Sequence, residues 1–482
     1  MSRQAGGHEA AELADGRRGG RRLAAPGPSV GGKGVRHRGG ERHLPPALGS
    51  AGGGRPPAGG QPRSAAGRPG GGCGPHRPDQ HFRRRRERGP AGDRGLDRTQ
   101  DDQRRSAVNF EFSESQESVA ALAEQVFSGS AGADRVAEVE RTADRFDREL
   151  WAALAASDLL GVAIRDEHGG LGLGMIETTL VLREQGRRVA PVPLWPTLVL
   201  GAMPIAEFGS QPLKDRWLGS VISGQAVITG ALSEWGADDA LSPSVSAVRL
   251  PDGSWELNGS KPAVPAAGVA DAVVVPARVV GGDDMAVFVV GLDTDGVEVS
   301  LSETTSREFH GELTLRSVVV GEDAMLGGAD GRTIVEWMLV RAQVAVAAVA
   351  LGCCEEATAM AAAYTSQREQ FGRPLSTNQG VAMRAADCYI DTDCMRVTLL
   401  QAAWLIDEGR SADEIADAAA VAKWWSADAG QRVVHATQHL HGGMGADVDY
   451  PVHRYFLWVK QLENTLGGGS RQLAAIGRAL VG

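Results

Sequence analysis

The sequence predicts an α+β fold in three parts: an N-terminal helical domain, a middle antiparallel β domain and a C-terminal four-helix bundle. This prediction depends on hydrophobic periodicity, which changes twice along the chain. Apolar residues recur first at helical spacing, then gather in short runs rich in Val and Leu, and then return to helical spacing. We place the three domains at residues 108–223, 224–328 and 329–482, after a segment at 1–107 that has neither pattern.

Residues 1–105 consist mainly of Gly, Arg, Pro and Ala, and Phe82 is their only aromatic residue. They hold 22 Lys and Arg against 10 Asp and Glu, whereas the rest of the chain holds 28 against 50. This segment has too few apolar side chains for their burial to offset the conformational entropy that the chain would lose on folding. We therefore expect 1–107 to be disordered. It is either an Arg-rich nucleic-acid arm that acts through Arg83–Arg86 or the result of a start codon assigned too early, with Val108 as the alternative start. We favour the second interpretation.

Composition also indicates which classes of partner the protein binds and in which cellular compartment it is located. The remainder of the chain is acidic, and an acidic surface repels nucleic acid. No uninterrupted run of about 18 apolar residues is present, so the sequence predicts no membrane span. The five cysteines form no CxxC pair and no secretory signal is evident, which is typical of reduced thiols in a cytoplasm. We therefore expect a cytoplasmic protein that binds neither nucleic acid nor a membrane.

The N-terminal domain is predicted to be helical from its caps and its periodicity. Ser113 followed by Gln116 is typical of a capping box, and apolar residues then recur at helical spacing as far as Val126. Glu167–Gly174, with the sequence EHGGLGLG, is predicted to be a loop between helices. The further predicted helices are Phe146–Ala155, Ile176–Gln185, Trp195–Phe208 and Leu213–Ile222.

The middle domain is predicted from seven short apolar runs that are separated by turn signals. Pro251–Gly253 and Asp293–Gly296 have the composition of tight turns, and Asn258–Gly259 is expected at a hairpin or at the end of a strand. The predicted strands are Val227–Leu232, Val245–Leu250, Ser254–Leu257, Ala272–Pro276, Met285–Val290, Val297–Leu301 and Glu312–Val320.

Long alanine-rich patterns predict the C-terminal bundle, since small residues let helices approach closely. The stretch His439–Phe456, HLHGGMGADVDYPVHRYF, interrupts them. Its glycines allow a tight turn and let a ligand lie against the main chain, although most glycine loops only turn the chain. Pro451 fits the first turn of a further helix. The predicted helices are one that begins at Gly331, then Thr377–Ile390, Val397–Asp407, Ala412–Thr437, the helix after Pro451, and Gln472–Leu480.

A second motif, Arg368–Leu375 with the sequence REQFGRPL, precedes the glycine loop. The two stretches, in this order and spacing, resemble the C-terminal domain of acyl-CoA dehydrogenases, the flavoenzymes that desaturate acyl-CoA thioesters. Glu167–Gly174 and the order of the three domains across 109–482 are similar to the same family. The form of the glycine loop resembles in particular actinobacterial enzymes of steroid catabolism, in which two different subunits form an α2β2 assembly.

Desaturation of a thioester needs a base for the α-proton, a hydride acceptor, and hydrogen bonds to the thioester carbonyl. No side chain accepts a hydride, so a flavin is required. The resemblance implies FAD as cofactor, an acyl-CoA substrate and an electron-transfer acceptor. It implies that Arg368 contacts the FAD pyrophosphate of a neighbouring subunit. The other FAD contacts that it implies are Phe371, His439 (where the family has Gln), Gly442, Gly443 and Ser233.

The segments that would hold the flavin ring depart from the family's pattern. Trp235 stands where the family has proline, and Lys261–Pro265 lacks the indole and the threonine that the family packs against the ring. A subunit with these changes would hold its own flavin weakly or not at all.

The catalytic base is also missing from the positions where the family carries it. These positions fall on Leu466 and on Ala342, and neither side chain can accept a proton. Glu463 is the nearest carboxylate in sequence, but we favour the interpretation that it is a solvated helix residue.

The sequence therefore supports one main hypothesis: a subunit of an FAD-dependent acyl-CoA dehydrogenase that lacks its own catalytic glutamate and completes the FAD site of a partner subunit. A steroid side-chain CoA thioester is the candidate substrate. Two alternatives stay open, namely a self-sufficient homotetramer with Glu463 as its base and a non-catalytic scaffold. The spacing of His435, His439, His441 and His453 is compatible with a metal site, but these residues match the flavoenzyme pattern, so we expect no metal.

Overall fold

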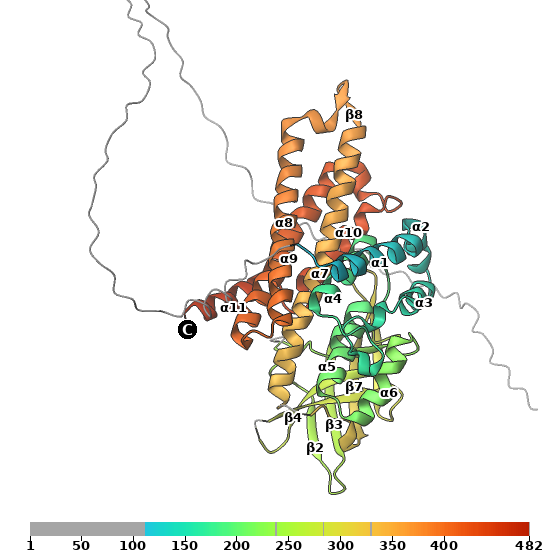
Figure 1. Ribbon diagram of the computed structural model, residues 1–482, viewed down its shortest axis with the longest axis vertical. Coiled ribbons are helices and arrows are strands. Elements are labelled where there is room, and N and C mark those ends of the chain that lie inside the picture. Colours follow the sequence, from blue (N-terminus) through green and yellow to red (C-terminus); the bar gives the residue numbers. More distant parts are fainter. Residues whose placement is uncertain (1–110, 237–238, 283, 328–329, 482) are drawn as a thin grey trace, which may run out of the picture. The chain divides into compact units, whose positions relative to one another are not determined.

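The computed structural model describes residues 111–236, 239–282, 284–327 and 330–481 (Figure 1). The segment 1–107, which the sequence predicts to be disordered, lies outside the described residues. Along the chain, helices come before and after a β-sheet. This order confirms the predicted α+β class and the sequence of its parts.

The N-terminal helices follow the predicted pattern. The Ser113 hydroxyl accepts a hydrogen bond from the Gln116 N–H at 3.2 Å, and the Gln116 side chain accepts one from the Ser113 N–H at 3.0 Å, which confirms the predicted capping box. The predicted helix at 195–208 is a π-helix (Pro196–Ala202) that continues into α5. The α-helices are α1 (Glu114–Ser130), α2 (Ala133–Val139), which was not predicted, α3 (Arg148–Ala156), α4 (Met175–Arg188), α5 (Met203–Phe208) and α6 (Gln211–Ile222).

Seven strands form one sheet in the order β1-β4-β2-β3-β7-β6, with β5 paired to β4. All seven lie on predicted apolar runs. The pairs β1–β4 and β2–β4 are parallel, however, so the sheet is mixed and the expectation of a purely antiparallel domain is wrong in this respect. Apolar runs identify strands but not their partners, and β4 lies between two strands that come earlier in the chain. The strands are β1 (Ile228–Gly230), β2 (Ser246–Arg249), β3 (Trp255–Pro265), β4 (Ala272–Val279), β5 (Met285–Gly291), β6 (Val297–Glu303) and β7 (Phe309–Val320).

Asn258 and Gly259 lie inside β3 and do not form the predicted turn. They coincide with a shift in the register of β3 against β7. Gly259 has a φ of +138°, and a Cβ at this position would lie 2.8 Å from the Cα of Val245. The Asn258 side chain accepts a hydrogen bond from the Ser317 N–H at 2.7 Å. The turn-type residues thus serve a β-bulge rather than a chain reversal.

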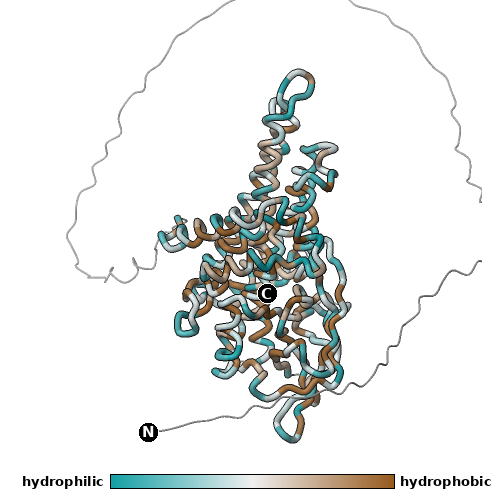
Figure 2. Tube along the Cα trace, turned by 90° about the vertical axis from the view of Figure 1, so that its right-hand side faces the viewer, coloured by the Kyte–Doolittle hydropathy of each residue, from teal (hydrophilic) through white to brown (hydrophobic). Residues whose placement is uncertain are grey.

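The C-terminal helices α7 (Gly331–Gln367), α8 (Gln379–Asp407), α9 (Ala412–Leu440) and α10 (Val452–Asn464) pack together, and α11 (Gly469–Val481) packs on α9. Hydrophobic segments gather where these helices meet (Figure 2). α8 is one continuous helix where the sequence predicted two. The charged stretch 391–396 interrupts the apolar pattern, but Asp391 pairs with Arg432 of α9 and Arg396 pairs with Glu355 of α7. These ion pairs let the helix continue.

α4 and α7 meet at a pair of glycines. A Cβ on Gly186 would lie 2.0 Å from the carbonyl oxygen of Val349, and a Cβ on Gly352 would lie 1.9 Å from that of Arg183. Real side chains do not tolerate such distances to a backbone. The two helices therefore touch along their main chains, which no other residue type would allow at these two positions.

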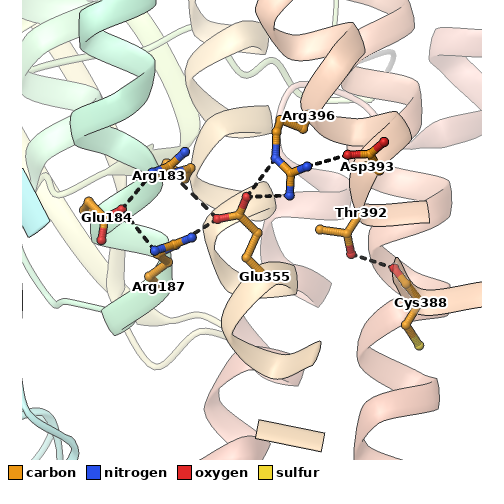
Figure 3. Close-up of polar contacts among 8 residues, drawn as sticks. All are labelled: Arg183, Glu184, Arg187, Glu355, Cys388, Thr392, Asp393 and Arg396. Atoms are coloured by element: carbon orange, nitrogen blue, oxygen red, sulfur yellow. Dashed lines mark hydrogen bonds and ion pairs between the residues drawn. The ribbon is translucent and has the colours of Figure 1, made fainter. Parts of the chain in front are cut away.

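A buried carboxylate connects three helices beside this contact (Figure 3). Glu355 of α7 lies 2.8 Å from Arg187 and 3.7 Å from Arg183, both on α4, and 3.1 Å from Arg396 of α8. Burial raises the pKa of the neighbouring Glu184, which the same two α4 arginines approach. The three helices thus share one network of charge-assisted hydrogen bonds.

α7 is long and apolar enough to cross a membrane by length and composition alone, although 72% of its most apolar 18-residue window is buried inside the protein. Burial of this kind is also found in the core helix of a soluble protein. Within the described residues, it is the only helix of that length and composition.

We expect the replacement Gly352→Ala to lower the melting temperature of the protein by several degrees, because overpacking at a helix contact costs roughly 1–3 kcal/mol. Gly219→Ala is the matched control: Gly219 lies in α6 with no atom within 4 Å of an added Cβ. There the loss of chain entropy in the unfolded state should leave stability unchanged or raise it. Thermal unfolding of the two variants, followed by circular dichroism, checks the prediction, which fails if both behave alike.

Candidate functional site

The first sequence motif forms an exposed hairpin between α7 and α8. Arg368 caps the C-terminus of α7, and its N–H donates to the carbonyl of Tyr364 at 2.8 Å. The strands β8 (Glu369–Gln370) and β9 (Arg373–Pro374) form the hairpin, and Phe371 at its tip has a φ of +58° and is 96% exposed. In the described part of the chain the Arg368 guanidinium has no hydrogen-bond or ion-pair partner. It is therefore available to an anion from outside the chain.

The glycine loop presents bare main chain. It forms a short 3₁₀ turn, Gly442–Ala446, where Gly442 has a φ of +61°. No atom lies within 4 Å of a Cβ built on Gly442 or Gly443, and both residues are exposed. Gly445 differs, since a Cβ there would lie 2.2 Å from the carbonyl oxygen of Gln438. Gly445 thus allows the backbone to pass close to Gln438, whereas Gly442 and Gly443 leave an open backbone surface on which a ligand can lie.

An aromatic stack holds the hairpin and the loop side by side. The ring of Tyr364, one helical turn before Arg368, lies 4.7 Å from the ring of His441, which precedes Gly442. The ring of Tyr450 also contacts the His441 ring, with 5.2 Å between the ring centroids. The His441 Nδ1–H donates to the carbonyl of Thr437 at 2.7 Å, and burial lowers the pKa of His441. The sequence argument missed this link, although the spacing of Tyr364 from Arg368 was a visible signal.

His439 faces away from this stack and makes a contact that the sequence did not suggest. Its Nδ1 is hydrogen-bonded to the guanidinium of Arg384, an exposed residue in the first third of α8. No motif marks Arg384, because its role depends on how α8 packs against α9. Arg368, Arg384 and His439 supply N–H groups on the hairpin end of the bundle, together with the bare main chain of the loop.

The remaining histidines have local partners. His435 meets the ring of Phe456 edge to face at 4.7 Å, and the His453 Nδ1–H donates to the carbonyl of Tyr450 at 2.7 Å. Within the part of the chain that the structure describes, no three His, Cys, Asp or Glu side chains are grouped as metal ligands.

In the segments expected at the flavin ring, Lys261 and Trp235 have polar partners within the chain. Lys261 is fully buried and paired with Glu234, and burial lowers the pKa of this lysine. The Trp235 indole N–H donates to the Ser260 hydroxyl at 3.0 Å. Ser233, just beyond β1, is half-buried. These polar groups are therefore already engaged within the chain.

A small cavity lies beside Pro265, at the end of β3. Its volume is about 90 Å³, and its lining includes Phe146, Trp195, Glu308 and His310. Sites for ligands of drug size enclose roughly 300 Å³ or more, so this cavity does not fit a flavin ring. Burial raises the pKa of Glu308 to about 7 and lowers that of His310 to about 4. Glu308 is thus a partly buried carboxyl group with a raised pKa that sequence reasoning did not single out.

The two sets of predicted FAD residues lie at opposite ends of α7 (Figure 1). α7 contacts β5 of the sheet at its N-terminal end and leads into the hairpin at its C-terminal end. With 37 residues, it is about 55 Å long. The structure therefore brings Arg368, Phe371, His439, Gly442 and Gly443 together, and it does not bring Ser233 to them.

The two positions where the family would carry its base do lie near each other. Gln343, next to the buried Ala342, donates from its side chain to the Gln472 side chain at 3.3 Å. Gln472 in turn donates to the carbonyl of Leu466 at 3.0 Å. Leu466 has a φ of +61° and packs against the core. An amide pair therefore occupies the space between these two positions.

Glu463 is committed elsewhere. Its carboxylate pairs with Lys460 at 2.6 Å, and its carbonyl accepts a hydrogen bond from Lys423 at 3.0 Å. Lys423 is fully buried in α9, and burial lowers the pKa of this lysine to about 7. Glu463 thus lies in the last turn of α10, where its polar groups already have partners within the chain.

The buried Lys423 predicts a specific pH dependence of stability. Between pH 7 and its ordinary pKa of 10.5, the unfolded state binds a proton that the folded state does not, so stability rises with pH in this window. Lys423→Met removes this contribution. We expect the melting temperature of the wild type, minus that of the variant, to increase as pH rises from 7 to 10. Parallel thermal scans of the two proteins measure this difference. A constant difference across that range would contradict the pKa shift.

These features are a helix–sheet–helix scaffold with an exposed arginine hairpin and an open glycine loop, and the comparisons give the family. The family described as "Acyl-CoA dehydrogenase, C-terminal domain" matches residues 329–481, and "Acyl-CoA dehydrogenase, N-terminal domain" matches residues 113–225. The chain belongs to the acyl-CoA dehydrogenase family. It is accordingly an oxidoreductase of a flavoprotein family whose cofactor is FAD.

The alignments with three relatives extend over nearly the whole length of each relative. It is 37% identical over 379 residues to acyl-CoA dehydrogenase FadE27 of Mycobacterium tuberculosis, covering 77% of this chain and 99% of the relative. It is 44% identical to a chain in the structure of a Tcur3481–Tcur3483 steroid ACAD variant, with a TM-score of 0.71 and coverage of 76% and 98%. The chain is 36% identical to a chain of the ChsE4–ChsE5 complex from Mycobacterium tuberculosis, with a TM-score of 0.72. The match covers 77% of this chain and 99% of that chain.

Proposed function

We propose that this chain is a subunit of a heteromeric FAD-dependent acyl-CoA dehydrogenase and that it completes the FAD site of a partner subunit. One observation carries the proposal: Arg368 and the glycine loop form an exposed surface at the far end of α7 from the sheet that would hold a flavin ring. A cofactor that contacts Arg368 must therefore have its ring in another chain.

The residues at the hairpin end fit the diphosphate part of FAD. The Arg368 guanidinium offers parallel N–H donors that match phosphate oxygens, and its location on a stable helix end limits the entropy lost on binding. Gly442 and Gly443 let the dinucleotide lie against the main chain. Phe371 offers an exposed ring at the hairpin tip, where burial against a partner or a base would release water. FAD, when bound, accepts the hydride from the β-carbon of the thioester.

The sheet end of this chain supports the other half of the proposal. The cavity beside Pro265 is too small for the ring, and Lys261 is already paired with Glu234. At the base positions, Ala342 and Leu466 carry no titratable group, and Glu463 is paired with Lys460. The partner subunit would then supply both the ring pocket and the base that takes the α-proton.

α8 has an apolar stripe that a partner subunit would cover. Met383, Ile390, Val397 and Trp404 recur at every seventh position and are all exposed. The opposite face of α8 is also apolar and is buried in the bundle. A helix that is apolar on both faces is typically buried on both, and a seven-residue repeat fits a long helix of a second chain. Because Met383 adjoins Arg384, this partner would also approach the cofactor surface.

The names of two relatives guide the choice of substrate and assembly. One solved relative is a steroid ACAD, and another is a complex of two proteins, ChsE4 and ChsE5. We extend both features to this chain: a steroid side-chain CoA thioester as substrate, a second acyl-CoA dehydrogenase subunit in an α2β2 assembly, an electron-transfer acceptor for the reduced flavin, and a cytoplasmic location. The domain limits at 108–223, 224–328 and 329–482 belong to the same proposal.

FAD content tests the proposal directly. We expect the full chain purified alone to hold almost no FAD, and the chain co-expressed with a second acyl-CoA dehydrogenase subunit that co-purifies with it to hold close to one FAD per pair of chains. In that complex, Arg368→Ala should release FAD about tenfold faster, because it removes charge-assisted hydrogen bonds. Arg410→Ala is the control, since Arg410 is exposed and pairs with Glu414 at the start of α9, away from the hairpin and the glycine loop in the chain.

Other outcomes identify the alternatives. One FAD per chain when purified alone, with turnover of an acyl-CoA thioester, would favour the self-sufficient enzyme. The replacements Glu463→Gln and Glu308→Gln would then show which carboxylate acts as its base. Unchanged FAD content and activity of the Arg368→Ala complex would favour a scaffold subunit.

The α8 stripe gives a separate prediction about assembly. We expect Val397→Glu to dissociate the complex, because it places a charge in the centre of the buried stripe. Ala416→Glu, at an exposed position of α9, adds the same charge away from the stripe and should leave the complex intact. Light scattering coupled to size-exclusion chromatography measures both variants. An intact complex with Val397→Glu would mean that α8 faces solvent in the assembly.

A further inference from the structure

The contact between Arg384 and His439 determines which nitrogen of the histidine carries the proton. A guanidinium has five N–H donors and no acceptor, so the His439 Nδ1 that bonds to Arg384 must accept. A neutral histidine that accepts at Nδ1 carries its proton on Nε2. His439 is exposed, so its Nε2–H is available outside the chain.

Competing carboxylates do not draw Arg384 away from this contact. Asp391, about two turns further along α8, makes two hydrogen bonds to Arg432, at 2.8 and 2.9 Å. Arg432 also pairs with Asp428. Asp387 lines the same groove as Arg384, but the described residues contain no ion pair between the two. Arg384 is thus left to His439.

We propose that Arg384 is a positioning residue for the cofactor: it holds His439 in the tautomer whose Nε2–H donates to an oxygen of the ADP part of FAD. This inference rests on the proposed function and deepens it. His439 stands next to the glycine loop, where a side-chain amide would offer one N–H donor. A histidine offers an equivalent donor only in this tautomer, and Arg384 is the group that selects it.

Arg384 therefore acts through His439 and does not itself bind the cofactor. This distinction is measurable, because glutamine at position 439 has an N–H donor whatever Arg384 does. Loss of Arg384 should matter when residue 439 is histidine and should not matter when it is glutamine. Such non-additivity is the signature of two residues that act as one unit.

The experiment uses the co-purified complex and measures the rate of FAD release by the rise in flavin fluorescence on dilution. We expect Arg384→Ala to speed release about fivefold, the effect of one lost hydrogen bond. Arg384→Lys should restore slow release, since an ammonium also only donates. Arg384→Glu should be as fast as alanine or faster, because a carboxylate accepts from Nδ1–H and turns Nε2 into an acceptor. In the His439→Gln background, Arg384→Ala should have no effect.

Two results would overturn the inference. Equal acceleration by Arg384→Ala in the histidine and glutamine backgrounds would mean that Arg384 contacts FAD directly. No acceleration in either background would mean that the pair has no role in FAD binding. Arg368→Ala separates this inference from the proposed function: if it speeds release while Arg384→Ala does not, only the inference on Arg384 fails. Melting temperatures of all variants confirm that each complex is folded.

Discussion

The close contact of α4 with α7 at Gly186 and Gly352 is the constraint on which the arrangement of this protein depends. Because a Cβ at either glycine would strike a backbone atom of the other helix, the two main chains touch. Only at this separation can the Glu355 carboxylate reach arginines of both α4 and α8. Desolvation offsets much of the attraction in such a network, but a missing partner would leave buried charge uncompensated. The contact thus determines how α7 is shifted along its axis and rotated about it relative to α4.

A fixed α7 acts as a rigid spacer. Ala342 and Arg368 are both on or next to this helix, 26 positions apart, which corresponds to about 39 Å. If the hairpin binds the phosphates of FAD, as we propose, the base positions and the hairpin cannot meet around one cofactor within one chain. A site that uses the hairpin must include a second chain, and this conclusion depends on helix length alone. The exposed stripe on α8, which starts beside Arg384, lies where that chain would approach.

Local features of the sequence were predictable, and long-range ones were not. The capping box at Ser113, the seven strands and the glycine loop all depend on neighbours within a few residues. The parallel pairs of β4, in contrast, join strands that are distant in sequence, and periodicity carries no information about pairing. The charges of 391–396 in α8 suggested a break because their partners lie on other helices. Arg384 was missed for the same reason: only the packing of α8 on α9 brings it to His439.

The two ends of α7 differ in how their polar groups are satisfied. At the sheet end, Lys261 bonds to Glu234 and Gln343 to Gln472, all within the folded chain. Breaking either pair to admit a ligand would leave a buried polar group unsatisfied, which is costly. At the hairpin end, the Arg368 side chain and the loop backbone are exposed, so an anion can bind there without breaking a buried hydrogen bond. The distribution of satisfied polar groups therefore supports the proposed cofactor site at the hairpin end, independently of any sequence motif.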